Sequence, residues 1–439
     1  MKNIGVIGCG NILETYLRSQ EYFNNINFVS CSDINMDLAK KTASENNLSA
    51  QTVEELLSDN RIDVVLNITI PQAHYAVSKK ILEAGKHVYS EKPMSVKYEQ
   101  ANELLKISKD KNLYFGNAPD TFLGGGGQLS REILDSQELG EILTGNFIFA
   151  FPGVQDFHPN PESWFQDGGG PVIDMGPYFF TTLVNLLGPA KNVRSRGVKF
   201  SNQREYNAGP KKGKFFNVDI PTSYMLNLEF HNNTIIQGFI SFDVLNHNRN
   251  HVELYGTKGS IVVPDPNMFG GPVITSRELG SDWLEHSVES KPLGKTNILN
   301  KTVRSNEAPK QSNYRGIGLS EMVDAIENKR EQRCNGELAL HVLDIIESTM
   351  IAAKNKTEVN MRSSCNKPSP LKDGEIQKSG KIAVYIIQAS QKLSSGRKPL
   401  DEVRLEIEKT LASEYESQSQ RQWFGRLKKK AYVRISLPN

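Results

Sequence analysis

The sequence is poor in cysteine and has no excess of charge. Its 439 residues include four cysteines, Cys9, Cys31, Cys334 and Cys365. Cysteines so few and so widely spaced give neither a disulfide framework nor a CxxC zinc site. The 52 Lys and Arg nearly balance the 50 Asp and Glu, which leaves a net charge of +2. This balance argues against a general nucleic-acid-binding protein, because such proteins carry a clear basic excess.

Long apolar runs are absent as well. No stretch reaches the roughly 18 apolar residues that a membrane helix needs. The opening residues, MKNIGVIG, enter a predicted strand without a signal-peptide pattern. We therefore expect a cytoplasmic protein. The chain length corresponds to two or three structural units of about 150 residues each.

Short apolar strands alternate with helical patterns at the start of the chain. Strands are expected at 3–8, 27–32, 62–68, 86–90 and 112–116, and helices at 11–23, 36–46, 72–84 and 96–109. This alternation predicts βαβ units and a parallel sheet. In such sheets ligands bind beyond the carboxyl ends of the strands.

A glycine-rich turn follows the first strand. Gly8 allows the tight turn, and Gly10 lets the backbone approach a pyrophosphate. The phosphate would then lie at the N-terminus of the helix that begins at Asn11 and Ile12, where free N–H groups favour anions. Leu13 stands where the third glycine of a GxGxxG motif is expected.

An acidic residue, Asp33, ends the second strand, 23 residues after Gly10. A carboxylate at this place can bind both hydroxyls of the adenosine ribose and repel a 2′-phosphate, so NAD is favoured over NADP. The alternative is a purely structural turn with Asp33 as a loop acid.

Two further strand ends carry polar residues. Pro71 suits the first turn of a helix, and His74 taken alone is typical of a surface histidine. Glu91, Lys92 and Pro93 follow the strand at 86–90. A lysine beside a nicotinamide could hydrogen-bond a substrate hydroxyl and shuttle its proton, whereas a lysine in an ordinary loop is only solvated.

The rest of the chain changes to a strand-rich pattern. Strands at 144–151, 223–230, 234–242, 251–255 and 259–263 predict a mainly antiparallel sheet. The four glycines 124–127 precede a predicted helix at 128–135. The polar segment 268–312 is predicted to be one long loop, and helices are expected at 316–328 and 336–354.

A second candidate site follows three glycines at 168–170. A helix is predicted from near Asp174 to Leu187, so that Asp174 and Tyr178, four residues apart, share one face. Alternatively, Asp174 caps the helix and Tyr178 is a core aromatic. A phenol acting as an acid or base needs a nearby cation. Lys92 is the candidate, with Asp174 orienting the lysine or the substrate.

The polar segment before these glycines contains a tryptophan. Trp164 offers an apolar plane for the C–H face of a sugar, and His158 and Asn160 could bind hydroxyls. An ordinary polar loop explains the same residues equally well. His158, His247 and His251 lack close metal-ligand spacing, so no metal site is predicted.

These motifs, in this order, resemble the Gfo/Idh/MocA oxidoreductase family. The matching segments are 4–12, Asp33, 71–95, 168–179, 252–267 and 314–326. The resemblance implies an α/β protein with an N-terminal Rossmann domain at 1–122. It also implies a C-terminal α/β domain at 123–360, built on a large, mostly antiparallel, open-faced sheet. A cis Lys92–Pro93 peptide bond is expected on the same basis.

The resemblance also implies an activity. Lys92, Asp174 and Tyr178 would be catalytic, although many members have histidine where Tyr178 stands, and Pro71, His74, Glu91 and Lys92 would line the cofactor. The expected reaction is NAD(P)-dependent hydride transfer to or from a secondary hydroxyl of a sugar, sugar derivative or cyclitol. A homodimer or homotetramer would form through the open sheet.

Two other functions stay open at this point. One is a non-catalytic sensor of the same fold, which the missing third glycine and the replaced histidine favour. The retained trio of Lys92, Asp174 and Tyr178 argues against it. The other is a sugar–sugar oxidoreductase that keeps its cofactor tightly bound.

The end of the chain does not fit the family pattern. Residues 361–439 are expected to be a basic tail, and positions 378–439 hold 13 Lys and Arg against 6 Asp and Glu. A helix is predicted at 399–415, and Trp423 and Phe424 interrupt a basic cluster at 421–430. Such a tail is either flexible or a contact for an acidic partner, nucleic acid or membrane surface.

Overall fold

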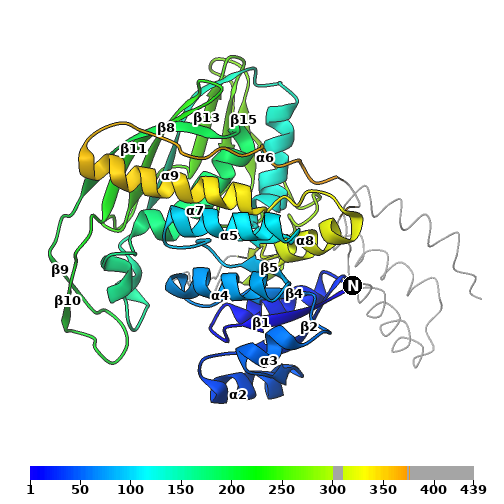
Figure 1. Cartoon of the computed structure of the whole chain (residues 1–439). Helices are drawn as coiled ribbons and strands as arrows, with labels where there is room; N and C mark the ends of the chain where they lie inside the picture. Colours follow the sequence, from blue (N-terminus) through cyan, green and yellow to red (C-terminus); the bar gives the residue numbers. More distant parts are fainter. Residues whose placement is uncertain (300–309, 373–374, 376–439) are drawn as a thin grey trace, which may run out of the picture.

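The first domain is a parallel sheet with helices on both faces. The computed structural model describes residues 1–299, 310–372 and 375 (Figure 1). Six strands lie in the order β3-β2-β1-β4-β5-β6, and every pair is parallel. The strands are β1 Lys2–Ile7, β2 Ile26–Ser32, β3 Ser49–Ala50, β4 Val64–Asn67, β5 His87–Ser90 and β6 Phe115–Asn117. The helices are α1 Leu13–Arg18, α2 Met36–Asn46, α3 Val53–Ser58, α4 Pro71–Glu83 and α5 Tyr98–Asp110.

Alternating side chains of the central strands bury both faces of this sheet. Val64 and Leu66 of β4 pack into one apolar cluster, with Tyr16 of α1 and Met322 of α8 (Ile317–Asn328). Val65 points the other way, into a cluster that α3, α4 and α5 complete. Near-continuous apolar strands are typical of parallel sheets covered on both sides. The predicted Rossmann architecture is confirmed.

The second domain is built on a nine-stranded sheet in the order β16-β15-β14-β13-β7-β12-β11-β8-β19. Its strands are β7 Ile142–Ala150, β8 Ala190–Val198, β11 Ser223–Phe230, β12 Ile235–Ser241, β13 Val252–Gly256, β14 Ser260–Val263, β15 Val273–Ser276, β16 Leu284–His286 and β19 Val359–Asn360. Only the β7–β12 pair is parallel in this described sheet. A mostly antiparallel sheet was expected and is confirmed.

Helices cover one face of the second sheet. They are α6 Gly125–Asp135, α7 Pro171–Leu187 and α9 Gly336–Asn355. Figure 1 shows α7 and α9 side by side, with α9 against the sheet at β8 and against α5 of the first domain. The opposite face leaves Met225 and Ile235 largely exposed. Smaller pairs are β9 Gln203–Glu205 with β10 Phe215–Asn217, and β17 Ile298–Leu299 with β18 Lys310–Gln311.

Several predicted elements differ from the structure. The helix expected at 11–23 is α1, followed by a 3-10 turn at Ser19–Glu21. The expected loop 268–312 contains β15 and β16, which extend the sheet at its edge. The helix expected at 128–135 begins at Gly125 instead. Glycine is required there because a Cβ on Gly125 would come within 2.6 Å of the Gly294 backbone. These contacts come from distant segments, so local patterns do not reveal them.

The segment 361–372, which follows β19, is bound to the body of the protein. Arg131 Nη1 donates to the carbonyl oxygen of Pro368 at 2.7 Å. The main-chain N–H of Leu371 donates to Gln128 Oε1 at 2.7 Å. Residues 361–372 therefore form part of the folded second domain. The helix predicted at 399–415 and the basic cluster at 421–430 lie outside the described residues. No helix among the described residues is long and apolar enough to cross a membrane.

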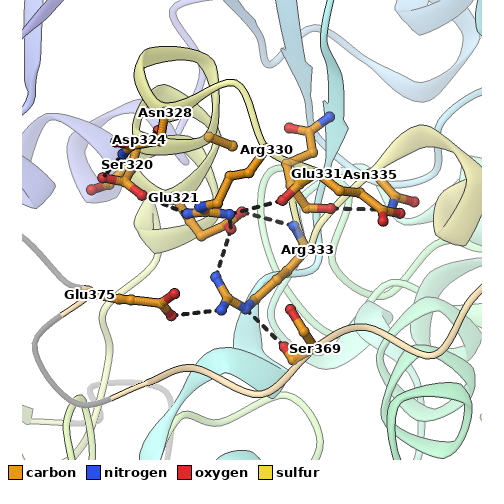
Figure 2. A network of polar contacts seen from close by, with 12 residues as sticks. Ser320, Glu321, Asp324, Asn328, Arg330, Glu331, Arg333, Asn335, Ser369 and Glu375 are labelled. Carbon is orange, nitrogen blue, oxygen red and sulfur yellow. Dashed lines mark hydrogen bonds and ion pairs between the residues drawn. The ribbon is translucent and has the colours of Figure 1, made fainter.

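A buried ion pair anchors this segment (Figure 2). Arg333 Nη1 lies 2.9 Å from Glu321 Oε1 of α8, and these two side chains are 4% and 3% exposed. The same guanidinium binds the carbonyl oxygens of Ser369 and Pro370 and the carboxylate of Glu375. Arg330 also pairs with Glu321. Arg333 thus binds both the buried carboxylate of Glu321 and the segment that follows β19.

Removing this arginine should therefore be costly. In Arg333→Met, the buried carboxylate of Glu321 keeps its ion pair with Arg330 but loses the one with Arg333. Three acceptors after β19, the carbonyl oxygens of Ser369 and Pro370 and the carboxylate of Glu375, lose their hydrogen-bond donor. We expect the free energy of unfolding to fall by about 3 kcal/mol, measured by urea denaturation. Arg194→Met is the matched control, because its ion pair with Glu358 is exposed and should contribute less than about 1 kcal/mol.

A buried histidine links α9 to the second sheet and to the segment that follows β19. His341 is 0% exposed. Its Nε2 accepts a hydrogen bond from the Ala190 N–H at 2.9 Å, and its Nδ1 contacts Ser363 Oγ at 3.1 Å. Burial lowers the pKa of His341 to about 4, against weaker raising effects of Asp344 and Ser363. The accepting nitrogen is consistent with a neutral ring.

This histidine should make stability depend on pH. Because the folded pKa lies below the ordinary value near 6.5, the unfolded chain binds the proton first. The contribution of the neutral ring to the free energy of unfolding is complete above about pH 6.5 and is lost as the pH falls towards 4. Over this range the free energy of unfolding of the wild type should fall by up to about 3 kcal/mol more than that of His341→Gln, measured by denaturation at each pH. The exposed His247→Gln should behave as the wild type.

Candidate active site

The glycine turn after β1 has the geometry that a bound phosphate requires. Gly8 has a φ of +106°, and a Cβ there would come within 2.7 Å of the carbonyl oxygen of Ile68. Only glycine fits this position. A Cβ on Gly10 would meet nothing within 4 Å, so the turn faces open space. Leu13, in place of the third glycine, is buried in the core.

Asp33 is fixed beside this turn. Its Oδ2 accepts the N–H of Cys9 at 2.8 Å, and its Oδ1 accepts the N–H of Asn35 at 2.8 Å. The adjacent Ile34 is fully exposed. A carboxylate at the end of β2, next to an open glycine turn, fits the ribose of a dinucleotide. The residues present therefore suit the expected cofactor, and Ile34 adds an apolar surface that the sequence reading did not single out.

His74 has a different environment from the one expected. It is not on the surface, since it is 1% exposed, and its place among the residues that line the cofactor stays a prediction. Its Nδ1 lies 2.7 Å from the carbonyl oxygen of Pro93, and its Nε2 lies 2.9 Å from that of Thr69. Burial lowers its pKa. The ring holds together the loops that follow β4 and β5, while Pro71 opens α4 as predicted.

The loop that carries Lys92 is held from several sides. The Lys92–Pro93 peptide bond is cis, as expected, and so is Ala118–Pro119. Glu91 accepts hydrogen bonds from Tyr16 Oη at 2.8 Å and from the main-chain N–H of Lys92 at 3.0 Å. Asn117 Nδ2 donates to the carbonyl oxygens of Ser90 and Glu91. Neighbouring strand ends thereby fix the position of the lysine.

The structure brings Lys92, Asp174 and Tyr178 together. Lys92 Nζ lies 2.9 Å from Asp174 Oδ1 and 2.6 Å from the carbonyl oxygen of Asp174. It also lies 5.1 Å from the centre of the Tyr178 ring. Because α7 begins at Pro171, with Gly170 before it, Asp174 is not the helix cap. It lies in the first turn, one turn before Tyr178.

Lys92 is held in its charged form. Burial alone would lower its pKa, but the charge of Asp174, with Tyr178, the Asp174 hydrogen bond and Glu91, raises the pKa above its ordinary value. A lysine in this state donates hydrogen bonds at neutral pH and does not accept a proton. Asp174 orients the lysine, which is one of the two roles expected for it.

The sequence reading missed a second cation at this site. Arg315 Nη2 lies 3.4 Å from Tyr178 Oη and 3.3 Å from Asn267 Oδ1. It stands in the turn before α8, which Asp120 holds by accepting hydrogen bonds from the N–H groups of Gly316 and Gly318. The segment 314–326 matched the family pattern, but nothing local in it points towards Tyr178.

The expected substrate residues form a small group of their own. The rings of His158 and Trp164 have centres 4.5 Å apart, and His158 Nδ1 accepts the N–H of Asn160 at 3.1 Å. Trp164 packs at the border of an apolar cluster. No described hydrogen bond or ring contact joins these three residues to Lys92, Asp174 or Tyr178. Their role in substrate binding stays a prediction.

Comparison with known proteins agrees with this fold. Residues 2–118 match the model of the oxidoreductase family with an NAD-binding Rossmann fold, and residues 128–262 match the GFO/IDH/MocA C-terminal domain. An uncharacterized oxidoreductase of Schizosaccharomyces pombe is 30% identical over 173 residues, covering 38% of this chain and 44% of that protein. D-xylose dehydrogenase of Paenarthrobacter nicotinovorans is 29% identical over 150 residues, covering 33% and 38%.

The match spans less than half of the length of each of these two relatives. Among solved structures, levoglucosan dehydrogenase in complex with NADH and L-sorbose has a TM-score of 0.68 at 19% identity. That alignment covers 82% of this chain and 99% of the other. At this level of identity the likeness shows a shared fold.

Proposed function

We propose, from the premise that this chain belongs to the GFO/IDH/MocA oxidoreductase family, that it is a nicotinamide-dependent dehydrogenase or reductase. Its substrate would be a secondary alcohol of a sugar, sugar derivative or cyclitol, or the matching ketone. The observation that carries this proposal is the contact of Lys92 with Asp174, beside Tyr178, at the carboxyl edge of the parallel sheet. Proton transfer needs such a set, whereas a ligand sensor does not.

The first domain would hold the cofactor. The turn from Gly8 to Gly10, with Asn11 and Ile12 after it, would bind the pyrophosphate. Asp33 would bind the adenosine ribose, and Pro71 and Glu91 would border the nicotinamide half. The bound cofactor supplies the hydride acceptor or donor. We favour NAD over NADP because the fixed carboxylate of Asp33 would repel a 2′-phosphate.

Residues from both domains would manage the proton. Lys92, held charged by Asp174, donates a hydrogen bond to the substrate oxygen and fixes its position. Tyr178, which lies within reach of the same site, takes the hydroxyl proton during oxidation and returns it during reduction. His158, Asn160 and Trp164 would contact the remainder of the sugar.

A sugar substrate is supported by the kinds of relatives that the chain matches. They include the D-xylose dehydrogenase, and the fold is shared with levoglucosan dehydrogenase. A homodimer or homotetramer would form through the open face of the second sheet, where Met225 is 56% and Ile235 48% exposed. Light scattering of the purified protein measures this assembly.

Substitution of the lysine tests the proposed chemistry. Lys92→Ala should bind NADH with an affinity within about twofold of the wild type, because the pyrophosphate and ribose sites are intact. Turnover should fall by a factor on the order of 100 or more. The assay follows NADH absorbance with D-xylose, levoglucosan and myo-inositol. The exposed Lys41→Ala serves as control, and equal turnover in both variants would refute the assignment.

Substitution of the acid tests the cofactor preference. Asp33→Ser removes the carboxylate that accepts the Cys9 N–H and would face the ribose. We expect NADH to bind about 10-fold more weakly and NADPH to bind more tightly than in the wild type, since charge repulsion is lost. Fluorescence titration of both nucleotides measures this. A wild type that binds NADPH as tightly as NADH would exclude the preference. Nucleotide retained through gel filtration would instead favour the sugar–sugar oxidoreductase.

A further inference from the structure

The phenolic oxygen of Tyr178 faces Arg315, whereas Lys92 lies by the ring. Arg315 Nη2 is 3.4 Å from Tyr178 Oη, and Lys92 Nζ is 5.1 Å from the centre of the ring. Within the described part of the chain, the Arg315 contact is the hydrogen bond that reaches this oxygen. Tyr178 is 7% exposed, so little water competes with the guanidinium.

The two cations differ in how their charge is used. Lys92 forms an ion pair with Asp174 at 2.9 Å and a second bond to its carbonyl oxygen. Arg315 binds two neutral oxygens, those of Tyr178 and Asn267. No carboxylate of the described chain forms an ion pair with it. Arg315 is therefore the cation in direct contact with the phenolic oxygen, while Glu91 and Asp120 act on it without a direct ion pair.

The fold keeps this guanidinium charged and in place. Burial alone would lower the pKa of Arg315, but Tyr178, Glu91 and Asp120 raise it. Asp120 is 0% exposed and binds the N–H groups of Gly316 and Gly318, directly after the arginine. A charge fixed before the reaction costs no reorganisation when a negative charge develops next to it.

We propose that Arg315 is a positioning residue that stabilises the phenolate of Tyr178, so that this tyrosine can act as the general base. The proposal rests on the proposed function and extends it. During oxidation the substrate O–H bond breaks and its proton passes to the phenolate oxygen. The hydride of the same carbon would pass to the cofactor that the first domain would hold, and the carbon–oxygen double bond would form, so that the alcohol would be oxidised and the dinucleotide reduced.

The charged groups around Tyr178 come from three elements. Lys92 lies in the loop after β5, Asp174 on the tyrosine's own helix α7, and Arg315 in the turn before α8. Because Lys92 and Asp174 neutralise each other, the loss of Arg315 should change the pH at which the phenolate forms. The loss of an ordinary structural arginine should leave that pH unchanged.

A pH–rate profile tests this role. The substrate is whichever compound of the panel above the wild type oxidises best. In Arg315→Gln, the acidic limb of kcat/KM should move to higher pH by at least about one unit, with kcat at pH 7 reduced about 10-fold or more. Arg315→Lys should move the acidic limb part of the way back and restore part of kcat. The exposed Arg194→Gln should match the wild type. An unmoved limb with a raised KM alone would overturn the proposal and make Arg315 a substrate ligand.

A second measurement needs no substrate and so separates this proposal from the function. In protein labelled with [13Cζ]tyrosine, the NMR signal that disappears in Tyr178→Phe is followed against pH. Its midpoint should lie at least about one pH unit higher in Arg315→Gln than in the wild type. Equal midpoints would refute the role of Arg315 even if the enzyme is active. A shifted midpoint without turnover would leave this contact valid and exclude the proposed reaction.

Discussion

The contact between Lys92 and Asp174 is the interaction on which the candidate site depends. Lys92 follows β5 of the first domain, and Asp174 lies in the first turn of α7 of the second. Their 2.9 Å ion pair is partly buried, and it joins the two domains beside Tyr178. A buried pair of this kind contributes geometry more than stability, because desolvation offsets much of the attraction.

Buried polar residues around this contact maintain it. His74 joins the loops after β4 and β5, and Asn117 binds the main chain on which Lys92 stands. Asp120 holds the turn of Arg315 by accepting hydrogen bonds from the main-chain N–H groups of Gly316 and Gly318. These residues are nearly inaccessible to solvent. Their hydrogen bonds are therefore strong, and their loss would shift the loops of the site.

Much of the fold was predictable because its signals are local. Alternating strands and helices predicted the parallel sheet, and the positions of Gly8 and Asp33 predicted the cofactor turn. Helix α7 was predicted after the three glycines but from near Asp174, whereas it begins at Pro171. The edge strands β15 and β16 escaped prediction because they are short and lie within a polar segment, and pairing with the existing sheet forms them. The start of α6 at Gly125 was not predicted, because the need for glycine there comes from a contact with Gly294, far along the chain.

By itself, the sequence determined the architecture, the family resemblance and the trio Lys92, Asp174 and Tyr178, because spacing on one helix and position at a strand end are local properties. Tertiary structure alone decided what each residue contacts. It buried His74 beneath the loops, paired Lys92 with Asp174 and brought Arg315 to the oxygen of Tyr178. The physical reason is that charge pairing and burial depend on residues far apart in the chain, 82 positions for Lys92 and Asp174 and 137 for Tyr178 and Arg315, which only the folded chain brings together.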